Sequence, residues 1–332
     1  MPVNIYDIAR KSGLSVVTVS RVLNNYPSVR ESNRAKVLAA MKELDYTPNA
    51  AARTLARGKK GMIGLILPCF FDAFMSKVMS SVEEALRENG LFLAVASASD
   101  GSGFEEIGYA KHFLGDRVDG LLIMTPLIDN GFILELKKRN MPLVLLDQHQ
   151  INLQVPTVTV DNFYGGYEAT LSLIRSGAQR IAHISGSDIF ESSRDRTRGY
   201  RKALEDNGME IREELLVKGN FSVKCGYDVT KMWSDRGILP DAVFASDDNI
   251  AFGILDAARE AGIPVPQKLS IIGYDNHPFT AVFHPSVSTV DQPAQKMAQS
   301  GVELLLDILG RKSKRISKIV LKPSIILRDT TP

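Results

Sequence analysis

The 332-residue sequence has few cysteines and no long apolar stretch. Its two cysteines, Cys69 and Cys225, cannot form a disulfide framework, and they lack the close paired spacing that a zinc site needs. No run of about eighteen apolar residues occurs, and residues 1–10 lack the apolar segment of a signal peptide. We therefore expect a reduced, cytoplasmic globular protein with no metal, no cofactor and no membrane partner.

The motifs of common enzyme classes are also missing. The sequence contains no G-x-S-x-G, no H-E-x-x-H, no G-x-x-x-x-G-K-[ST] and no S-x-x-K. The five histidines are scattered, and His183 lies in an apolar stretch typical of a packed strand rather than of a general base. These absences argue against an enzyme.

Positive charge is concentrated at the start of the chain. Residues 1–60 contain eleven Lys or Arg and four acidic residues, a net charge of +7, whereas the rest of the chain carries 29 basic and 34 acidic residues. A basic head on a mildly acidic body predicts attraction to nucleic-acid phosphates. On charge alone, a solvated basic surface is an equal alternative.

Three helices are expected in this head. Residues 5–12 have apolar side chains at helical spacing and end before Gly13, which permits a tight turn. Ser15 is placed to cap a second helix that begins at Val16, and a third is expected over residues 32–44. The expected core positions of the third helix are Val37, Leu38, Met41 and Leu44. Two short helices joined by a tight turn and backed by a third form the helix-turn-helix pattern.

The outward face of the second helix suits a DNA major groove. Val16 and Val17 are apolar side chains that fit thymine methyl groups, and Arg21 has the fork that binds guanine O6 and N7. The polar side chains expected to hold phosphates are Ser15, Ser20 and Asn24. An ordinary solvated helix face is the alternative, and the neighbouring turn and basic charge favour DNA.

A short helical segment follows the head. Asn49 can cap it, three alanines favour it and Gly58 ends it, yet it is too short to be stable alone in water. Leu55 has no core to join. A helix that forms only on DNA and wedges Leu55 into the minor groove explains both features, although a flexible linker is the simpler alternative.

From residue 61 onward, apolar runs alternate with amphipathic segments. Strands are expected at 62–67, 91–96, 120–124, 143–146, 157–160, 180–185, 242–245, 269–274 and 319–327, and helices at 73–88, 166–176, 196–207, 223–234, 250–261 and 294–309. This alternation predicts an α/β body of doubly wound parallel sheets with helices on both faces. The strands are too many for one comfortable sheet, so two similar lobes are expected.

Polar residues follow several of these strands, where doubly wound sheets bind ligands. Asp247 and Asp275 follow two strands, and Arg196 is expected to open a helix after a third. Phe74 and Phe221 are available for stacking. Carboxylates, a guanidinium fork and aromatic rings together are typical of a sugar site. Any single acid here is as readily explained by a strand-end turn or a helix cap.

Four segments carry a family resemblance. Residues 5–9 (IYDIA), 13–15 (GLS), 18–24 (TVSRVLN) and 46–56 (YTPNAAARTLA) resemble the LacI/GalR family of bacterial regulators, and the likeness continues along the whole chain. The resemblance implies a DNA-binding transcriptional regulator, a repressor of carbohydrate metabolism genes. It divides the chain into a helix-turn-helix domain (1–47), a hinge helix and linker (48–60) and an effector-binding and dimerisation body (61–332). Within a body like that of periplasmic sugar-binding proteins, the first lobe spans about 61–160 and 291–320, and the second about 161–290 and 321–332.

The resemblance also assigns residues. It adds Tyr6, Thr18 and Ser28 to the DNA contacts already named, and it brings in Asn49 and Ala56 beside Leu55. It supports Phe74, Arg196, Phe221, Asp247 and Asp275 in an effector pocket between the lobes, and it adds Gln292. Family members often carry Asn or Thr at the position of Asp247, so that contact is expected to differ.

The partners implied are double-stranded DNA with a pseudo-palindromic operator, a small effector and a second copy of the chain. No leucine heptads follow the last strand, so a dimer is expected rather than a tetramer. The acids and rings favour a sugar. A purine-responsive branch shares most pocket residues but has a second arginine where Phe190 stands, and a branch responsive to a phosphocarrier protein stays open. A transport protein would share the body, but it would need a signal peptide and have no use for the head.

Overall fold

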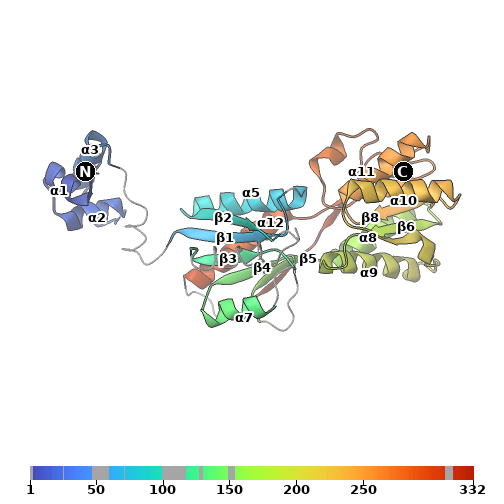
Figure 1. Cartoon of the computed structure of the whole chain (residues 1–332), viewed down its shortest axis with the longest axis horizontal. Helices are drawn as coiled ribbons and strands as arrows, with labels where there is room; N and C mark the ends of the chain where they lie inside the picture. Colours follow the sequence, from blue (N-terminus) through green and yellow to red (C-terminus); the bar gives the residue numbers. More distant parts are fainter. Residues whose placement is uncertain are drawn as a thin grey trace. The chain divides into compact units, whose positions relative to one another are not determined.

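The structure is a computed structural model of the chain, and it describes residues 3–24, 26–46, 60–70, 72–98, 117–126, 130–148, 154–310 and 317–332. The chain forms two compact units, Met1–Gly61 and Met62–Pro332, here called the head and the body. Both are drawn in Figure 1. Among the described residues, no helix is both long and apolar enough to cross a membrane.

In the part of the head that the structure describes, three helices form: α1 (Ile5–Ser12), α2 (Val16–Leu23) and α3 (Glu31–Glu43). Asn4 and Asp7 form a capping box at the start of α1, and Gly13 ends it with a φ of 68°. Ser15 caps α2 by accepting a hydrogen bond from the Thr18 backbone N–H, as its position predicts. The buried core consists of Ile8, Ala9, Val19, Val22, Val37 and Ala40.

Two expectations for the head are wrong in detail. Leu38 is 53% exposed, and Ala40 takes the expected core position beside Val37, because the third helix turns its Val37–Ala40 stripe inward. Val16 is only partly exposed, since its side chain packs against the head core.

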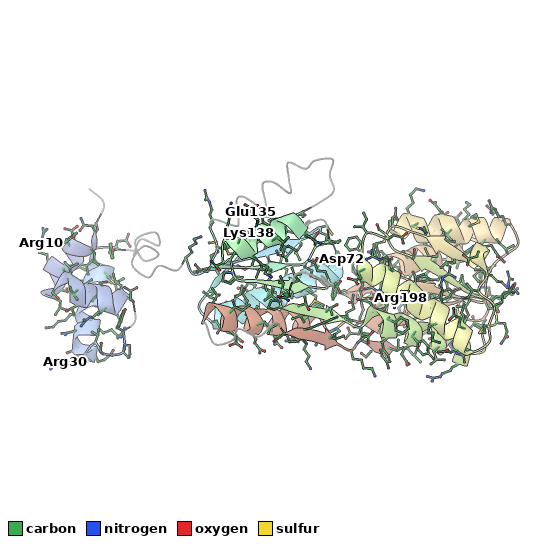
Figure 2. All side chains as sticks on the ribbon, turned by 90° about the horizontal axis from the view of Figure 1, so that it is seen from below. Arg10, Arg30, Asp72, Glu135, Lys138 and Arg198 are labelled. Carbon is green, nitrogen blue, oxygen red and sulfur yellow. The ribbon has the colours of Figure 1, made fainter. Side chains whose placement is uncertain are left out.

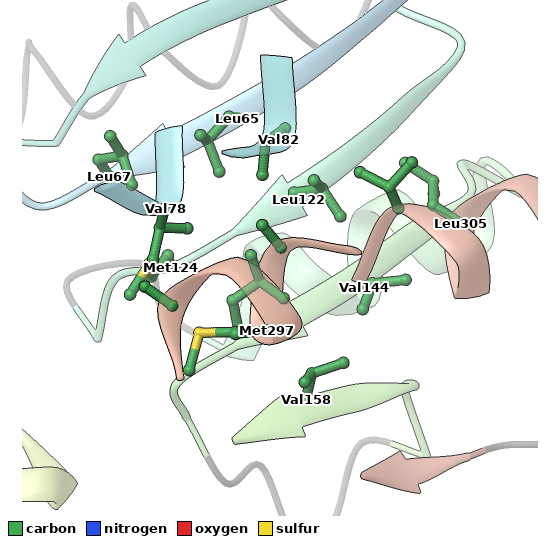
Figure 3. Packing of buried hydrophobic residues seen from close by; sticks show 14 of the residues in the cluster. Leu65, Leu67, Val78, Val82, Leu122, Met124, Val144, Val158, Met297 and Leu305 are labelled. Atoms are coloured by element: carbon green, nitrogen blue, oxygen red, sulfur yellow. The ribbon is translucent and has the colours of Figure 1, made fainter. Parts of the chain in front are cut away.

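The body begins with a parallel six-stranded sheet in the order β11-β5-β4-β3-β1-β2. Its strands are β1 (Met62–Leu67), β2 (Phe92–Ser97), β3 (Gly120–Ile123), β4 (Leu143–Leu146), β5 (Thr157–Val160) and β11 (Lys318–Leu321). Helices α5 (Ala73–Glu88) and α12 (Ala294–Leu309) cover one face, and α7 (Asn130–Lys138) covers the other. Leu65 belongs to the apolar cluster on the α5 and α12 side of the sheet, which also contains Val82 of α5 and Met297 of α12 (Figure 3). Its neighbour Ile66 lies on the opposite face, which α7 covers. This sheet and its helices are called the first lobe.

The second lobe has a parallel four-stranded sheet in the order β7-β6-β8-β9. Its strands are β6 (Ile181–Ser185), β7 (Leu216–Lys218), β8 (Ala242–Ala245) and β9 (Ser270–Ile272), and its short 3-10 helices are η1 (Glu213–Leu215) and η2 (Pro278–Ala281). Helices α8 (Asn162–Arg175) and α9 (Glu191–Asp206) cover one face, and α10 (Val223–Asp235) and α11 (Asp248–Glu260) cover the other. His183 is fully buried between the rings of Tyr200 and Phe244, so it is a packed core residue as expected.

The chain passes between the lobes three times. It leaves the first lobe after β5, returns between β10 (Thr289–Asp291) and α12, and leaves again between β11 and β12 (Ser324–Ile326). Strands β10 and β12 pair antiparallel, separately from both large sheets. The single strand expected at 319–327 is therefore two strands, which are separated at Pro323, a residue without a backbone N–H for a sheet.

Most helices of the second lobe begin earlier than their apolar periodicity indicates. Helix α9 begins at Glu191 rather than at Arg196, and α8 begins at Asn162 rather than at residue 166. Asp161 caps α8 by accepting a hydrogen bond from Tyr164 N. The first turns of both helices carry polar residues that face the body's interior, so the apolar pattern alone does not reveal them.

Candidate functional site

Helix α2 presents part of its expected base-reading face to solvent. The Val17 side chain is 61% exposed, and Arg21, one turn later, is also exposed. Within the described part of the chain, the Arg21 guanidinium forms no ion pair, so it is available to an outside acceptor. Val16 contributes only its outer edge, because it packs inward.

The polar residues around α2 are held in place by one another. The hydroxyls of Ser15 and Thr18 lie 2.9 Å apart, and Asn24 Nδ2 donates to the Ser20 carbonyl at 2.9 Å. Tyr6, at the start of α1, is 65% exposed, and Ser28 is exposed in the loop before α3. The remaining expected DNA contacts, Asn49, Leu55 and Ala56, lie outside the described residues.

The head keeps an excess of positive charge that its own acids do not neutralise. Arg10 pairs with Asp7, Lys11 with Glu43 and Arg34 with Glu31. Among the described residues 3–46, the other cationic side chains have no such pair; they are Arg21, Arg30, Lys36 and Lys42. An exposed valine and arginine on one helix, in a unit with surplus positive charge, suit a DNA groove.

A cavity of about 490 Å³ lies between the two lobes of the body. Its wall is built mainly from residues that follow the carboxyl ends of strands: Asp72 after β1, Asp147 after β4, Asn220 after β7, Asp247 after β8 and Asp275 after β9. Figure 2 shows Asp72 at the end of the first lobe that faces the second. All six expected effector residues line this one cavity; they are Phe74, Arg196, Phe221, Asp247, Asp275 and Gln292.

Arg196 is the buried centre of the cavity wall, with only 3% of its surface exposed. Its Nε donates to Asn162 Oδ1 at 2.9 Å, and its Nη1 donates to the Ser246 carbonyl at 2.6 Å. Its Nη2 lies 3.7 Å from Asp275 Oδ1. These contacts fix the plane of the guanidinium, because α9 and α8 and the ends of β8 and β9 all hold it.

Three carboxyl groups of the cavity have raised pKa values. Burial raises the pKa of Asp147 to about 7, although nearby Arg196 lowers it in part. Burial and then the charge of Asp275 raise the pKa of Asp247 to about 7. Burial raises the pKa of Asp275 to about 6 against the opposing effect of Arg196. These three carboxyl groups therefore change between their protonated and ionised forms close to neutral pH.

Two of these carboxyl groups also have structural work. Asp247 caps α11: its Oδ1 accepts from Ile250 N at 2.8 Å and its Oδ2 from Asn249 Nδ2 at 3.1 Å. Asp275 Oδ1 accepts from Gln292 Nε2 at 2.5 Å. The position of Asp247 is thus compatible both with a role as a helix cap and with a role in ligand binding.

Aromatic rings close one side of the cavity. Phe190 and Phe221 meet edge to face with ring centroids 5.6 Å apart, and Phe74 contributes from the first lobe. Gly186, at the end of β6, makes room for this arrangement, because a Cβ there would lie 1.9 Å from Phe221 Cζ. The rings can stack on the apolar face of a sugar or a base.

Sequence reasoning missed several cavity residues, of which Asp147 is the most important. It directly follows the apolar run of β4, so the strand-end rule that identified Asp247 and Asp275 also applies to it. Asn162, which accepts a hydrogen bond from Arg196, was missed because it lies in the polar first turn of α8. Asp248, next to Asp247, is not among the residues that line the cavity. It accepts from His277 N at 2.6 Å and from Thr289 Oγ1 at 2.7 Å, and so joins the loop at His277 to strand β10.

Comparisons with known proteins agree with both parts. Residues 4–49 match the bacterial regulatory proteins of the lacI family, and residues 171–331 match the periplasmic binding protein-like domain. Catabolite control protein A of Priestia megaterium is 31% identical over 332 residues, which cover 100% of both chains. The crystal structure of the lac repressor dimer bound to operator and the anti-inducer ONPF is 28% identical with a TM-score of 0.89, covering 100% of this chain and 99% of that one.

A third similar protein is the transcriptional regulator CelR in complex with cellobiose, with 28% identity, a TM-score of 0.75 and 99% coverage of each chain. The described helix-turn-helix head, the parallel-sheet body and the full-length relative all agree. The chain belongs to the LacI family of bacterial DNA-binding transcriptional regulators, with a helix-turn-helix head and a periplasmic-binding-protein-like body.

Proposed function

We propose that the protein is a repressor of carbohydrate metabolism genes whose DNA binding is switched by a small sugar in the cavity between the lobes. The observation that carries this proposal is the cavity itself, where carboxyl groups, one buried arginine and three phenylalanine rings converge. Such a combination suits a polyhydroxylated ring, because hydroxyls donate to carboxylates and the apolar sugar face stacks on aromatic side chains. The similar protein CelR binds cellobiose.

The head supplies the DNA-binding part of the proposal. Val17 and Arg21 read bases in the major groove, with Val16 at the edge of that contact. The residues proposed to contact the backbone or groove edge are Tyr6, Ser15, Thr18, Ser20, Asn24 and Ser28. In the hinge segment at 48–60, Leu55 wedges into the minor groove with Asn49 and Ala56 beside it.

The assembly is a homodimer that binds a pseudo-palindromic operator. Because the operator is bacterial DNA, the protein acts in the bacterial cytoplasm. The similar lac repressor was crystallised as a dimer bound to operator, and two identical heads related by a two-fold axis match two inverted half-sites. We propose 1–47 as the DNA-binding domain and 61–332 as the effector-binding and dimerisation body. The first lobe consists of about 61–160 and 291–320, and the second of about 161–290 and 321–332.

The cavity couples to the head through the first lobe. A sugar that contacts Phe74 on the first lobe and Arg196, Phe221, Asp247 and Asp275 on the second favours one relative position of the lobes; Gln292, beside the second crossing, joins them. That position sets whether the hinge helix forms on DNA. An effector that prefers one state tenfold shifts the equilibrium by about 1.4 kcal/mol per site.

A purine effector is the second candidate. The rings of Phe74, Phe190 and Phe221 suit a flat base, but Phe190 occupies the place of an arginine that the purine-responsive branch uses. A protein coeffector would leave the cavity without a role. A thermal-shift screen distinguishes the purine effector and the protein coeffector from a sugar effector.

A thermal-shift screen of the full-length protein tests the effector class. The panel holds simple sugars, short oligosaccharides, sugar phosphates and purines. A ligand at about 100 times its Kd adds about 2.7 kcal/mol to the free energy of unfolding, which raises the body's midpoint by several degrees. We expect a shift from one sugar series. A shift from purines alone, or none across the panel, would contradict a sugar effector and leave the DNA-binding part standing.

A further inference from the structure

The charge of the cavity is strongly unbalanced. Among the described residues that line it, four are carboxylic acids, Asp72, Asp147, Asp247 and Asp275, and Arg196 is the one permanent cation. Lys77, on the nearby helix α5, does not line the cavity and lies 3.7 Å from Asp291. An anionic ligand would therefore meet an excess of like charge.

The single arginine is already engaged inside the protein. Its Nε and Nη1 donate to Asn162 and to the Ser246 carbonyl, and its Nη2 lies 3.7 Å from Asp275 Oδ1. Its face is covered by the ring of Tyr274 at 3.7 Å. The charge of Arg196 is thus opposed by Asp275 within the wall, and it does not balance the other three acids for an incoming anion.

The wall offers acceptors instead. Gln292 is 1% exposed, and its Nε2 donates a hydrogen bond to Asp275 Oδ1. Its Oε1 is buried and has no hydrogen-bond partner among the described residues. Among the described residues, the Asp147 carboxylate accepts one long hydrogen bond, from Asn162 Nδ2 at 3.4 Å. A buried acceptor without a donor, such as Gln292 Oε1, is costly, so a ligand that donates hydrogen bonds here gains more than one that accepts them.

We infer that the cleft ligand is an amino sugar whose protonated amine lies between the acids of the two lobes, with Asp147 as its main partner from the first lobe. The inference rests on the proposed sugar-switched function and narrows its ligand. An ammonium group brings three donors, no acceptor and one positive charge, which matches the imbalance of this wall. The Phe190 and Phe221 rings add favourable contact for a cation next to them.

The acids also act on one another across the cleft. The charge of Asp275 raises the pKa of Asp147 and of Asp247, after burial as the larger cause in both. The charge of Asp72 raises the pKa of Asp275, after burial and against Arg196. A cation placed among these groups relieves this mutual repulsion, whereas a neutral hydroxyl in the same place does not.

Matched sugars test the inference on the full-length protein. Calorimetric titration at pH 7.5 compares glucose, galactose and mannose with their 2-amino-2-deoxy, N-acetylamino and 6-phosphate derivatives. We expect one amino sugar to bind about tenfold or more tightly than its hydroxyl parent and its N-acetyl derivative, because only the amine is charged. We expect the 6-phosphates to bind more weakly than their parents.

A single-residue change locates the amine. Asp147→Asn keeps the side-chain shape and suits the φ of 50° at this position, so the body is expected to fold. The ratio of the amino sugar's affinity to that of its hydroxyl parent should fall about tenfold in this variant. Glu135→Gln is the matched control, since it removes a first-lobe carboxylate that pairs with Arg139 outside the cavity (Figure 2), and it should keep the full advantage.

Each contrary result has a distinct meaning. Parents that bind as tightly as their amino derivatives overturn the amine and leave the sugar effector standing. If the amino sugar still binds more tightly than its parent by the full factor in Asp147→Asn, the amine does not bind at Asp147. Tighter binding of a phosphate overturns the charge argument. If no sugar binds while the same sample binds operator DNA, both the amine and the sugar effector are wrong, and the DNA-binding function stands.

Discussion

Arg196 lies over the ring of Tyr274, with 3.7 Å between the guanidinium carbon and the ring centroid. Its nitrogens contact Asn162, the Ser246 carbonyl and Asp275, so the side chain joins α8, α9 and the ends of two strands. Gly165 permits this arrangement, because a Cβ there would lie 2.1 Å from the Tyr274 hydroxyl oxygen. The arginine therefore supports the second lobe as well as the cavity.

Removal of this arginine should destabilise the body. Arg196→Ala leaves Asp275 buried without its cation, and breaking a buried pair costs about 3–5 kcal/mol. We expect the body's thermal midpoint to fall by about 6 °C or more, measured by calorimetry. The double variant Arg196→Ala, Asp275→Asn removes the stranded charge as well and should recover part of the loss. A midpoint equal to that of the unmodified protein would show that the pair carries no stability.

The buried acids should make the ligand-free body less stable as the pH rises. The folded-state pKa values of Asp147 and Asp247 are raised by burial to about 7, above the ordinary value of 3.8. Their contribution to stability is therefore complete below about pH 4 and is lost as the pH rises through 7. His183 opposes this trend, since burial lowers its pKa from 6.5 to about 4, but its effect ends near pH 6.5.

We accordingly expect the free energy of unfolding to fall between about pH 6.5 and 8, measured by urea titration at several pH values. Asp147→Asn should flatten this slope and raise the stability at pH 8, because it removes one ionising buried group. Equal slopes in the two proteins would contradict a raised pKa at Asp147.

Much of the fold follows from sequence patterns. The apolar run at β1 and the amphipathic stretches of α5 and α12 predict those elements at their observed bounds, because both faces of the sheet are buried and each helix buries one stripe. The turn at Gly13 and the cap at Ser15 identify the head, since positive φ and N-caps have strong residue preferences.

The parts that could not be predicted depend on packing in three dimensions. Arg196 was expected at a helix start, and its place in the second turn of α9 follows from a polar first turn that carries no apolar signal. The edge-to-face contact of Phe190 with Phe221 depends on the space left by Gly186, which spacing along the chain does not show.

Arg21 should determine sequence preference in DNA. Arg21→Ala removes the proposed guanine contact, so we expect about a 10- to 100-fold loss of affinity for an operator selected with the unmodified protein, and relaxed preference at one base pair. Fluorescence anisotropy against single-substitution operators measures both. Arg30→Ala removes an equally exposed arginine outside α2 and should leave the preference pattern unchanged. Relaxed preference in that control instead would place base reading elsewhere.

Leu55, which lies outside the described residues, should affect operator binding but not sugar binding. We expect Leu55→Ala to weaken operator binding about tenfold or more and to reduce the DNA bend measured by energy transfer between end labels, because no wedge enters the minor groove. Sugar affinity should stay within about twofold, because the described residues that line the cavity all belong to the body. Leu38→Ala, an exposed leucine of α3, is the control and should bind operator normally.

The most direct test of a sugar-switched repressor is the operator affinity with and without the cleft ligand. The full-length protein is titrated with operator DNA in the absence of sugar and again with the tightest sugar from the panel at about 100 times its Kd, where the site is nearly full. We expect the operator Kd to change by tenfold or more, in either direction, and the sugar's own Kd to change by the same factor when operator is bound. An operator Kd that stays the same with the cavity occupied would show that the cleft does not control DNA binding.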